Sequence, residues 1–233
     1  MDLLEALSKA GFTRHESELY LILCKEGEIS GYEAAKLSGI SRSNAYLALA
    51  GLAEKGGAYR IEGETMRYAA VPIGELAANL RREFEEILDY LVQNIPDRSE
   101  PSNSFLTIAG EKQVIAKIRF IINQARERIY LALSRPELEF FTPELDLAAG
   151  RGLKVALITE TQPGVEGAIW YRRERQQAGQ IRLIADSAVV LTGELQLSQT
   201  ANCIYSQNLI LVQLIKDSLT NEIKLIETKL EGR

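Results

Sequence analysis

The sequence predicts an α+β protein with two domains and a long amphipathic helix between them. Residues 1–72 combine short amphipathic helices with one β-hairpin, residues 73–95 repeat apolar residues at helical spacing, and residues 104–233 alternate strands with helices. A chain of 233 residues has room for two modest domains. Its 46% hydrophobic and 25% charged residues are typical of a globular protein.

Two helices are predicted at the start of the chain. Leucines within residues 3–7 mark a short helix that ends at Gly11. Thr13 caps a longer one, and Glu16 follows at the spacing of a capping box. His15, the only histidine, lies in the first turn of this helix. We interpret it as a solvated polar residue and not as a metal ligand or an acid–base catalyst.

Residues 30–55 predict two short helices joined by a tight turn. Ser30 and Glu33 again have capping-box spacing, and Gly39 ends the first helix because glycine tolerates the positive φ of a helix C-terminus. Ser41 caps the second helix. One buried stripe is expected on that helix, formed by Ala45, Leu49 and Leu52.

The exposed start of the second helix carries Arg42, Ser43, Asn44 and Tyr46. A helix with such a first turn, held at an angle by a glycine turn, is typical of a recognition helix in the DNA major groove. The alternative is an ordinary helical hairpin with a polar end.

A β-hairpin is predicted directly after this helix, with its turn at residues 62–65. A hairpin in this position is the wing of a winged helix-turn-helix, and Arg60 and Arg67 are placed to meet the phosphate backbone or the minor groove. The predicted DNA-binding residues are Ser30, Tyr32, Ser41, Arg42, Ser43, Asn44, Tyr46, Lys55, Arg60 and Arg67.

Residues 1–72 resemble the winged-helix domain of the TrmB-type, sugar-responsive transcriptional regulators. The resemblance implies a DNA-binding regulator whose main partner is double-stranded DNA. One departure is Gly57, where the family usually carries an apolar residue. The matching positions are Gly11, Thr13, Glu16, Tyr20, Ala35, Ser38, Gly39, Ile40, Arg42, Ser43, Tyr46, Leu49, Leu52, Lys55, Gly56, Tyr68, Ala70 and Pro72.

The net charge of −5 is unusual for a protein that binds nucleic acid. Residues 1–72 hold eight basic and ten acidic residues, so that 8 − 10 = −2. DNA binding therefore has to rely on a local cluster, for which Arg42, Lys55, Arg60 and Arg67 are the candidates. We expect a modest affinity that weakens steeply with salt.

Residues 73–95 predict one amphipathic helix of about three heptads. It could pack on its own domain or pair with a second copy, and we favour pairing because two copies would set the spacing of two half-sites. The resemblance also implies a dimerising helix here. The predicted dimerisation residues are Leu76, Leu80, Phe84, Ile87, Leu88 and Leu91. Residues 96–103, with two prolines and no periodicity, are the predicted linker.

Residues 104–233 predict a parallel or mixed sheet with helices packed on it. Helices are expected at 111–127, at 136–149 and after Ser206, and residues 167–179 are interpreted as a short basic helix. The expected strands are 105–109, 129–133, 153–159, 180–185, 188–192 and 201–205.

This pattern resembles half of a phospholipase-D-like α/β domain, which TrmB-type regulators carry behind the dimerising helix. Catalytic members of that superfamily use a histidine nucleophile, and residues 104–233 contain no histidine. We therefore predict that the chain is not an enzyme, with a phosphodiesterase as the disfavoured alternative. A scaffold that binds a protein through the winged helix is a second alternative.

The second domain is expected to bind a small-molecule effector of unknown identity or to provide further dimer contacts. Candidate effector-binding residues are Trp170, Tyr171, Arg172, Arg173 and, across the sheet, Asp186. The alternative is a surface helix with a solvated basic face.

The remaining features predict a cytoplasmic protein without cofactor or metal. No secretory signal and no membrane-spanning stretch is present. Cys24 and Cys203 are predicted to be reduced and buried, and no paired Cys/His spacing suggests a zinc site.

Overall fold

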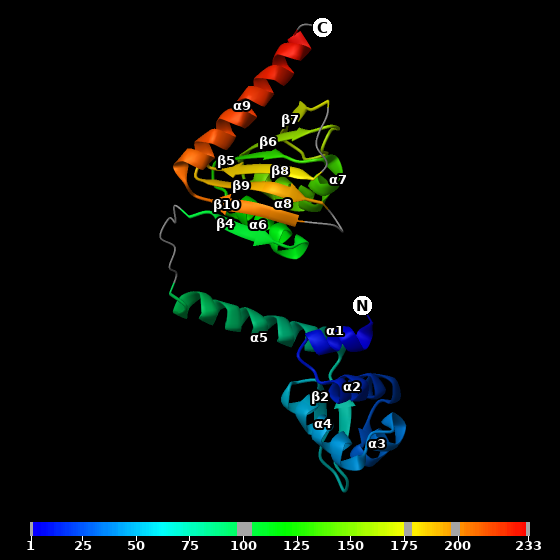
Figure 1. The fold of residues 1–233 in the computed structure, drawn as a ribbon. Coiled ribbons are helices and arrows are strands. Elements are labelled where there is room, and N and C mark those ends of the chain that lie inside the picture. Colours follow the sequence, from blue (N-terminus) through cyan, green and yellow to red (C-terminus); the bar gives the residue numbers. More distant parts are fainter. Residues whose placement is uncertain (1, 97–103, 175–178, 197–200, 232–233) are drawn as a thin grey trace. The chain divides into compact units, whose positions relative to one another are not determined.

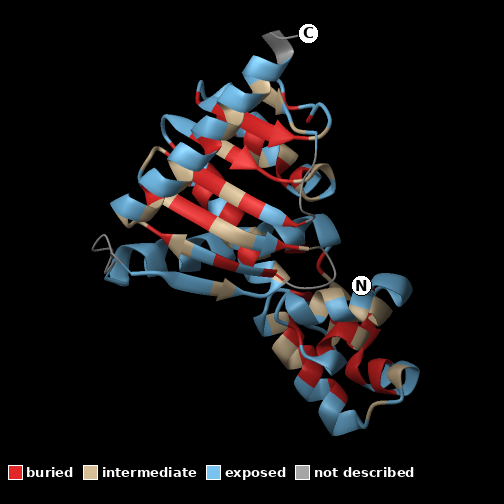
Figure 2. Cartoon of the chain, turned by 45° about the horizontal axis from the view of Figure 1, so that its top comes forward, coloured by how far each residue is buried: buried red, intermediate tan, exposed pale blue. Residues whose placement is uncertain are grey.

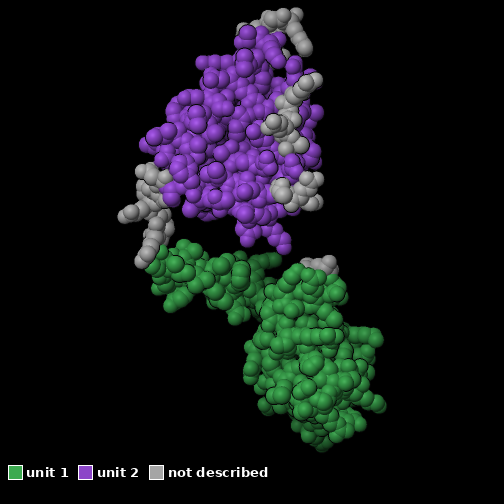
Figure 3. Space-filling view, viewed as in Figure 1, with its two compact units in different colours: residues 1–97 green, residues 98–233 purple. Residues whose placement is uncertain are grey.

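The computed structural model describes residues 2–96, 104–174, 179–196 and 201–231. The chain forms two compact units, residues 1–97 and residues 98–233, which Figure 3 shows in different colours. Residues 97–103, most of the predicted linker, lie outside the described residues.

Helices make up most of unit 1, as Figure 1 shows. They pack with a small antiparallel sheet in the order β1-β3-β2. The elements of unit 1 follow one another as expected for a winged helix-turn-helix followed by a long helix. They are α1 (Leu3–Lys9), α2 (Arg14–Glu26), β1 (Ile29–Ser30), α3 (Gly31–Ser38), α4 (Arg42–Glu54), β2 (Ala58–Ile61), β3 (Arg67–Ala70) and α5 (Ile73–Asn94).

Local sequence signals set where the helices of unit 1 begin and end. Thr13 and Ser30 each form a full capping box with the glutamate three residues later. Gly39 ends α3 with a φ of 70°, in the left-handed region that favours glycine. Ser41 caps α4 by accepting a hydrogen bond from the backbone N–H of Asn44.

The core of unit 1 lies between α2, α3, α4 and the sheet, and Figure 2 shows it as the buried residues inside a shell of exposed ones. Leu76 belongs to this core with 1% of its surface exposed, so its assignment to the dimerisation face was wrong. It anchors the first turn of α5 to the domain instead. Gly57 also packs against the core, because a Cβ at this position would overlap Leu52. Glycine therefore lets Leu52 fill the space that an apolar residue would take.

Unit 2 contains a seven-stranded mixed sheet in the order β4-β10-β9-β8-β5-β6-β7. The neighbours β5, β6 and β7 are parallel, and the other pairs are antiparallel. The strands are β4 (Leu106–Ala109), β5 (Arg128–Ala132), β6 (Lys154–Thr159), β7 (Ile169–Arg172), β8 (Gln180–Ala185), β9 (Val189–Leu195) and β10 (Ala201–Ser206). The α+β class and the alternation of strands with helices are confirmed.

Helices cover both faces of this sheet. The larger core lies on the side of α6 (Glu111–Gln124) and α8 (Thr142–Gly150), which follows α7 (Arg135–Leu138) and a 3-10 turn at Glu139–Phe141. The smaller core lies under α9 (Leu209–Glu231). Glu222 of α9 forms ion pairs with Arg173 and Arg182, which tie this helix to the sheet.

Two expectations about local structure were wrong. Residues 169–172 of the expected basic helix form β7, because they extend the parallel edge of the sheet beside β6. Part of the predicted helix, residues 175–178, lies outside the described residues. Cys24 is exposed on α2, whereas Cys203 is buried as expected.

Candidate nucleic-acid interface

The first turn of α4 presents polar side chains to solvent. Arg42, Ser43 and Asn44 are all exposed. The hydroxyl of Ser41 lies 3.3 Å from that of Ser43 and accepts from the N–H of Asn44, so the cap is part of the same polar surface. The free N–H groups of a helix start add donors that can reach a phosphate.

Two tyrosines connect this turn of α4 to the start of α3. The guanidinium of Arg42 lies 4.5 Å from the centre of the Tyr32 ring, a cation–π contact that links α4 to the start of α3. The ring of Tyr46 lies against Gly31 so closely that a Cβ there would overlap it. Tyr32 and Tyr46 remain 50% and 43% exposed, so both can also contact a ligand.

The arginines of the wing are held by hydrogen bonds within unit 1. Arg60 donates to the carbonyl oxygen of Ala50 at 3.3 Å, which places its side chain along α4. Arg67 forms an ion pair with Glu28 at 2.7 Å and also donates to the carbonyl oxygen of Glu28. Because these groups are exposed or partly exposed, a phosphate could compete for both arginines.

Glu33 lies beside Arg67 and stays ionised. Hydrogen bonds from the backbone N–H and the hydroxyl of Ser30, followed by the charge of Arg67, lower the pKa of Glu33. Ser30 itself is buried, and its hydroxyl is used by the capping box with Glu33. Its assignment to the DNA-binding surface was therefore wrong, since it shapes the start of α3 from inside.

Lys55 also lies away from the polar turn. It caps the opposite end of α4, about 20 Å from Arg42 at 1.5 Å per residue. Its ammonium group binds the carboxylate of Glu16 at 2.7 Å and the carbonyl oxygen of Gly11 at 2.9 Å. Burial would raise the pKa of Glu16, but the hydrogen bonds from Lys55 and Thr13 outweigh it and lower that pKa. The structure does not place Lys55 in the cluster with Arg42.

The effector candidates of unit 2 do not converge on one site. Arg172 and Arg173 lie at the carboxyl end of β6, whereas Asp186 lies beside Arg128 at the amino end of the parallel strand β5, so the length of the strands separates them. The carboxylate of Asp186 accepts three backbone N–H groups, each at 2.9 Å, from residues 126–128. Its role in the structure is to close a turn.

The aromatic candidates are also used within the fold. The indole N–H of Trp170 donates to the carbonyl oxygen of Thr159 at 3.2 Å. Tyr171 packs under α9, and burial raises its pKa. Among the described residues, no cluster of His, Cys, Asp and Glu could hold a metal ion, and no helix is both long and apolar enough to cross a bilayer.

Two family models match the chain in succession. Residues 7–74 match "Sugar-specific transcriptional regulator TrmB", and residues 104–214 match "Transcriptional regulator TrmB, EBD N-terminal subdomain". The chain belongs to the TrmB family of transcriptional regulators. The exposed turn of α4 and the wing therefore lie in the DNA-binding domain of a TrmB-type regulator.

Two curated relatives of this TrmB-type regulator are each 26% identical to it over the aligned residues. Uncharacterized protein YrhO of Bacillus subtilis aligns over 97% of the chain and 86% of its own length. The HTH-type sugar sensing transcriptional regulator TrmBL1 of Pyrococcus furiosus aligns over 62% of the chain. The aligned part of the chain spans only 44% of TrmBL1.

The solved structures that resemble the chain are distant. TrmBL2, described as an archaeal chromatin protein with a novel mode of DNA binding, has 16% identity and a TM-score of 0.47, over 95% of this chain and 97% of that one. The phospholipase D family member Nuc from Salmonella typhimurium has 13% identity and a TM-score of 0.42, over 51% of this chain and 92% of that one.

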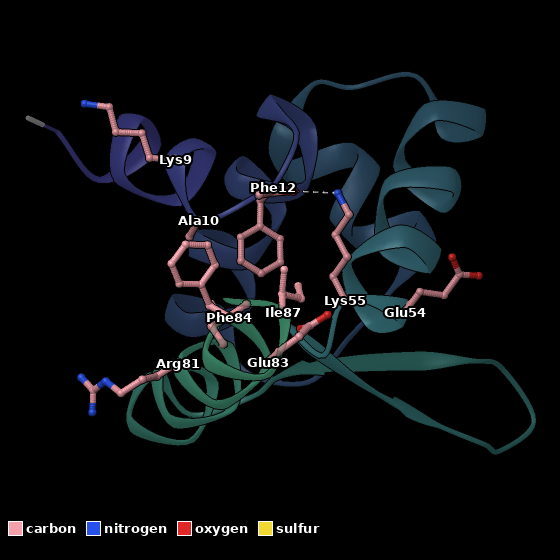
Figure 4. Close-up of a pocket in the computed structure, with 11 residues that line it drawn as sticks. Lys9, Ala10, Phe12, Glu54, Lys55, Arg81, Glu83, Phe84 and Ile87 are labelled. Atoms are coloured by element: carbon pink, nitrogen blue, oxygen red, sulfur yellow. Dashed lines mark hydrogen bonds between the residues drawn. The ribbon is translucent and has the colours of Figure 1, made fainter. Parts of the chain in front are cut away.

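Sequence reasoning missed a groove on unit 1. It has a volume of about 640 Å³ and lies between the α1–α2 loop, the end of α4 and the side of α5. Figure 4 shows Phe12, Phe84 and Ile87 pointing into it. The only sequence signal for this groove is the apolar repeat of residues 73–95. The contribution of Phe12 could not be predicted, because Phe12 lies far away in the sequence.

Proposed function

We propose that this regulator binds an operator as a homodimer, with the first turn of α4 in the major groove and the wing against the backbone. The observation that carries the proposal is the exposed set Arg42, Ser43 and Asn44 at the start of a helix held by a glycine turn. Arg and Asn are the side chains that form bidentate contacts with guanine and adenine.

The contacts around this turn support a reading function more than a structural one. Arg42 has an aromatic platform in Tyr32 that limits its freedom before DNA arrives. Ordering a long side chain on binding costs about 0.5–1.5 kcal/mol, so an arginine that is already held should bind more tightly. Arg60 and Arg67, on the two strands of the wing, have exposed or partly exposed guanidinium groups that can take phosphate contacts.

The rest of the chain is assigned by the same proposal. The apolar side of α5 joins two copies, and unit 2 binds a small-molecule effector or adds contacts between copies. The chain acts in the cytoplasm as a regulator. It is not a phosphodiesterase or another enzyme of the phospholipase-D type, since residues 104–233 contain no histidine that could act as the nucleophile. The name of TrmBL1 makes sugars the first effectors to test.

A selection from fragmented genomic DNA with the purified full chain tests the proposal. We expect enrichment of one inverted repeat with two half-sites, each read by the α4 helix of one copy. The centres of the half-sites should be about one helical turn of DNA, or a multiple of it, apart. Adding a panel of sugars and other metabolites to the same selection tests for an effector. Recovery of unrelated sequences, with no common half-site, would contradict specific operator binding.

A further inference from the structure

The outward face of α4 carries a leucine that does not belong to the core of unit 1. The buried side of this helix is formed by Ala45, Ala48, Leu49 and Leu52. At about 3.6 residues per turn, Leu47 lies on the opposite side. It is 71% exposed. Helix formation does not require an apolar residue here, since lysine, glutamine and glutamate form helices about as well as leucine. Neither the core nor helix propensity therefore accounts for a leucine at this position.

Leu47 is a direct neighbour of the polar first turn of α4. It follows Asn44 by three residues and Ser43 by four, and side chains at these spacings are neighbours on a helix, with about 5–6 Å between their Cβ atoms. Both neighbours are exposed. Around the helix axis Leu47 falls between them, one turn further along. A surface that follows the outward face of α4 from the first turn therefore covers Leu47 as well.

The same face of α4 becomes acidic toward its C-terminal end. Ala50 is half-buried, and its carbonyl oxygen accepts a hydrogen bond from Arg60 of the wing. Glu54, the next residue along the outward face, is exposed. Its carboxylate would repel DNA phosphates. The part of α4 that can approach base edges therefore ends before Glu54, and Leu47 contributes an aliphatic surface to that part.

One base edge in the major groove offers an apolar partner for such a side chain. Thymine carries a C5 methyl group there, and apolar side chains read it by direct contact. We propose that Leu47 is a specificity-determining residue that packs on the C5 methyl group of one thymine in each half-site. This inference rests on the proposed operator binding and names one base that the operator must contain.

The position of this thymine follows from the spacing of side chains on α4. Leu47 and Asn44 have Cβ atoms about 5–6 Å apart, whereas successive base pairs are about 3.4 Å apart. The thymine therefore lies within about two base pairs of the base that Asn44 contacts. Asparagine pairs best with adenine, so the central part of each half-site should be rich in A·T pairs.

An exposed leucine alone is not a sign of binding, because single apolar residues are common on protein surfaces. Leu47 differs by its position, between two polar residues of an exposed helix start in the DNA-binding domain of the family. Burial of one methyl group against it would strengthen binding by a factor of about four. This contribution is apolar, so salt should leave it unchanged while it weakens the phosphate contacts.

Deoxyuridine tests the contact without a change in base pairing, because uracil is thymine without the C5 methyl group. Each thymine of one half-site of the selected operator is replaced in turn, and the affinity of the full chain is measured. We expect one replacement to lower the affinity by about fourfold. The total affinity should fall between ~50 and ~200 mM salt, but this ratio should stay the same.

Variants of Leu47 assign the effect to this side chain. Leu47→Ala is too short to reach the methyl group and Leu47→Gln is polar, so each should bind the thymine and deoxyuridine operators equally. Leu47→Met keeps a long apolar side chain and should keep the difference. Leu3→Ala, which removes another exposed leucine of unit 1, is the matched control and should behave like the parent. Because Leu47 lies outside the core, all these variants should unfold like the parent.

The outcomes separate this inference from operator binding itself. An operator that depends on Arg42 and Asn44, but on none of its thymine methyl groups, would overturn the inference alone. A Leu47→Ala chain that retains the parent's loss at the same thymine would also overturn it, since another residue would then contact the methyl group. A selection that yields no common half-site would overturn both the inference and the proposed function.

A repeated selection with Leu47→Gln provides a second test. We expect the preference for thymine to disappear at the position found with deoxyuridine, while the rest of the half-site stays as it is for the parent. The Leu3→Ala chain should select the parental half-site unchanged. An unchanged thymine preference in the Leu47→Gln selection would contradict the assignment of this residue.

Discussion

Gly31→Ala should destabilise unit 1, although alanine is the better helix former. Gly31 is the first residue of α3, and the three atoms nearest to an added Cβ would all be ring carbons of Tyr46, closer than real Cβ atoms approach. The methyl group and the ring cannot both keep their positions. Tyr46 lies on α4, so its displacement changes how α3 holds the recognition helix.

The expected loss follows from two opposing effects. Overpacking of a close contact costs about 1–3 kcal/mol. Replacing a helical glycine with alanine returns about 0.5–1 kcal/mol. Because the ring of Tyr46 is 43% exposed and can rotate toward solvent, we expect a net loss of about 1 kcal/mol in the free energy of unfolding.

Denaturant unfolding with two probes measures this loss in the full chain. Trp170, the only tryptophan, lies in unit 2, so the unfolding transition followed by its fluorescence should be unchanged. The part of the helical circular dichroism signal that is lost when unit 1 unfolds should shift to lower denaturant. Gly74→Ala is the matched control, because a Cβ there meets nothing within 4 Å. Tyr46→Ala should suppress the effect of Gly31→Ala, and a Gly31→Ala chain as stable as the parent would refute the reasoning.

Three further outcomes are expected. Leu76→Ala should lower the stability of unit 1 by about 2–5 kcal/mol in denaturant unfolding, whereas Leu3→Ala, at a position on α1 that is 68% exposed, should leave it nearly unchanged. The pKa of Glu16 is lowered from 4.5, so its ionised form stabilises the fold above pH 4.5, and this contribution is lost as the pH falls through the folded pKa. Glu16→Gln should therefore flatten the pH dependence of unit 1 stability below pH 4.5. A thiol reagent should modify exposed Cys24 within minutes under native conditions and spare buried Cys203, and equal reactivity of the two would contradict the burial of Cys203.

The elements of unit 1 could be predicted because their signals are local. A capping box needs only two residues three positions apart, as in Ser30 and Glu33, and Gly39 marks the end of the same helix through its own backbone conformation. Local sequence does not determine which residues of a long amphipathic helix are covered by the helix's own domain. Leu76 and Leu80 have the same spacing pattern as Phe84, but only the packing of the domain shows that Leu76 is core.

Errors in the candidate sites arose where a side chain has a partner far away in sequence. Lys55 was expected beside Arg42, but it pairs with Glu16, which is 39 positions earlier. Asp186 was expected to join the effector site from across the sheet, but the antiparallel pairing of β8 with β5 places it at the amino end of β5, away from Arg172 at the carboxyl end of β6. Charge and residue type were enough to choose the candidate site residues. Which of them lie close together depends on the tertiary fold.

The central claim is that Arg42 and Asn44 read base pairs, and the operator affinity of the Arg42→Ala/Asn44→Ala double variant tests it most directly. The control is Arg14→Ala, which removes an exposed arginine from α2. At about 1–3 kcal/mol for each base contact, the double variant should lose roughly 30-fold or more on the selected operator, keep its affinity for unrelated DNA, and unfold like the parent. Operator affinity equal to that of the parent, in a variant that folds normally, would contradict the claim.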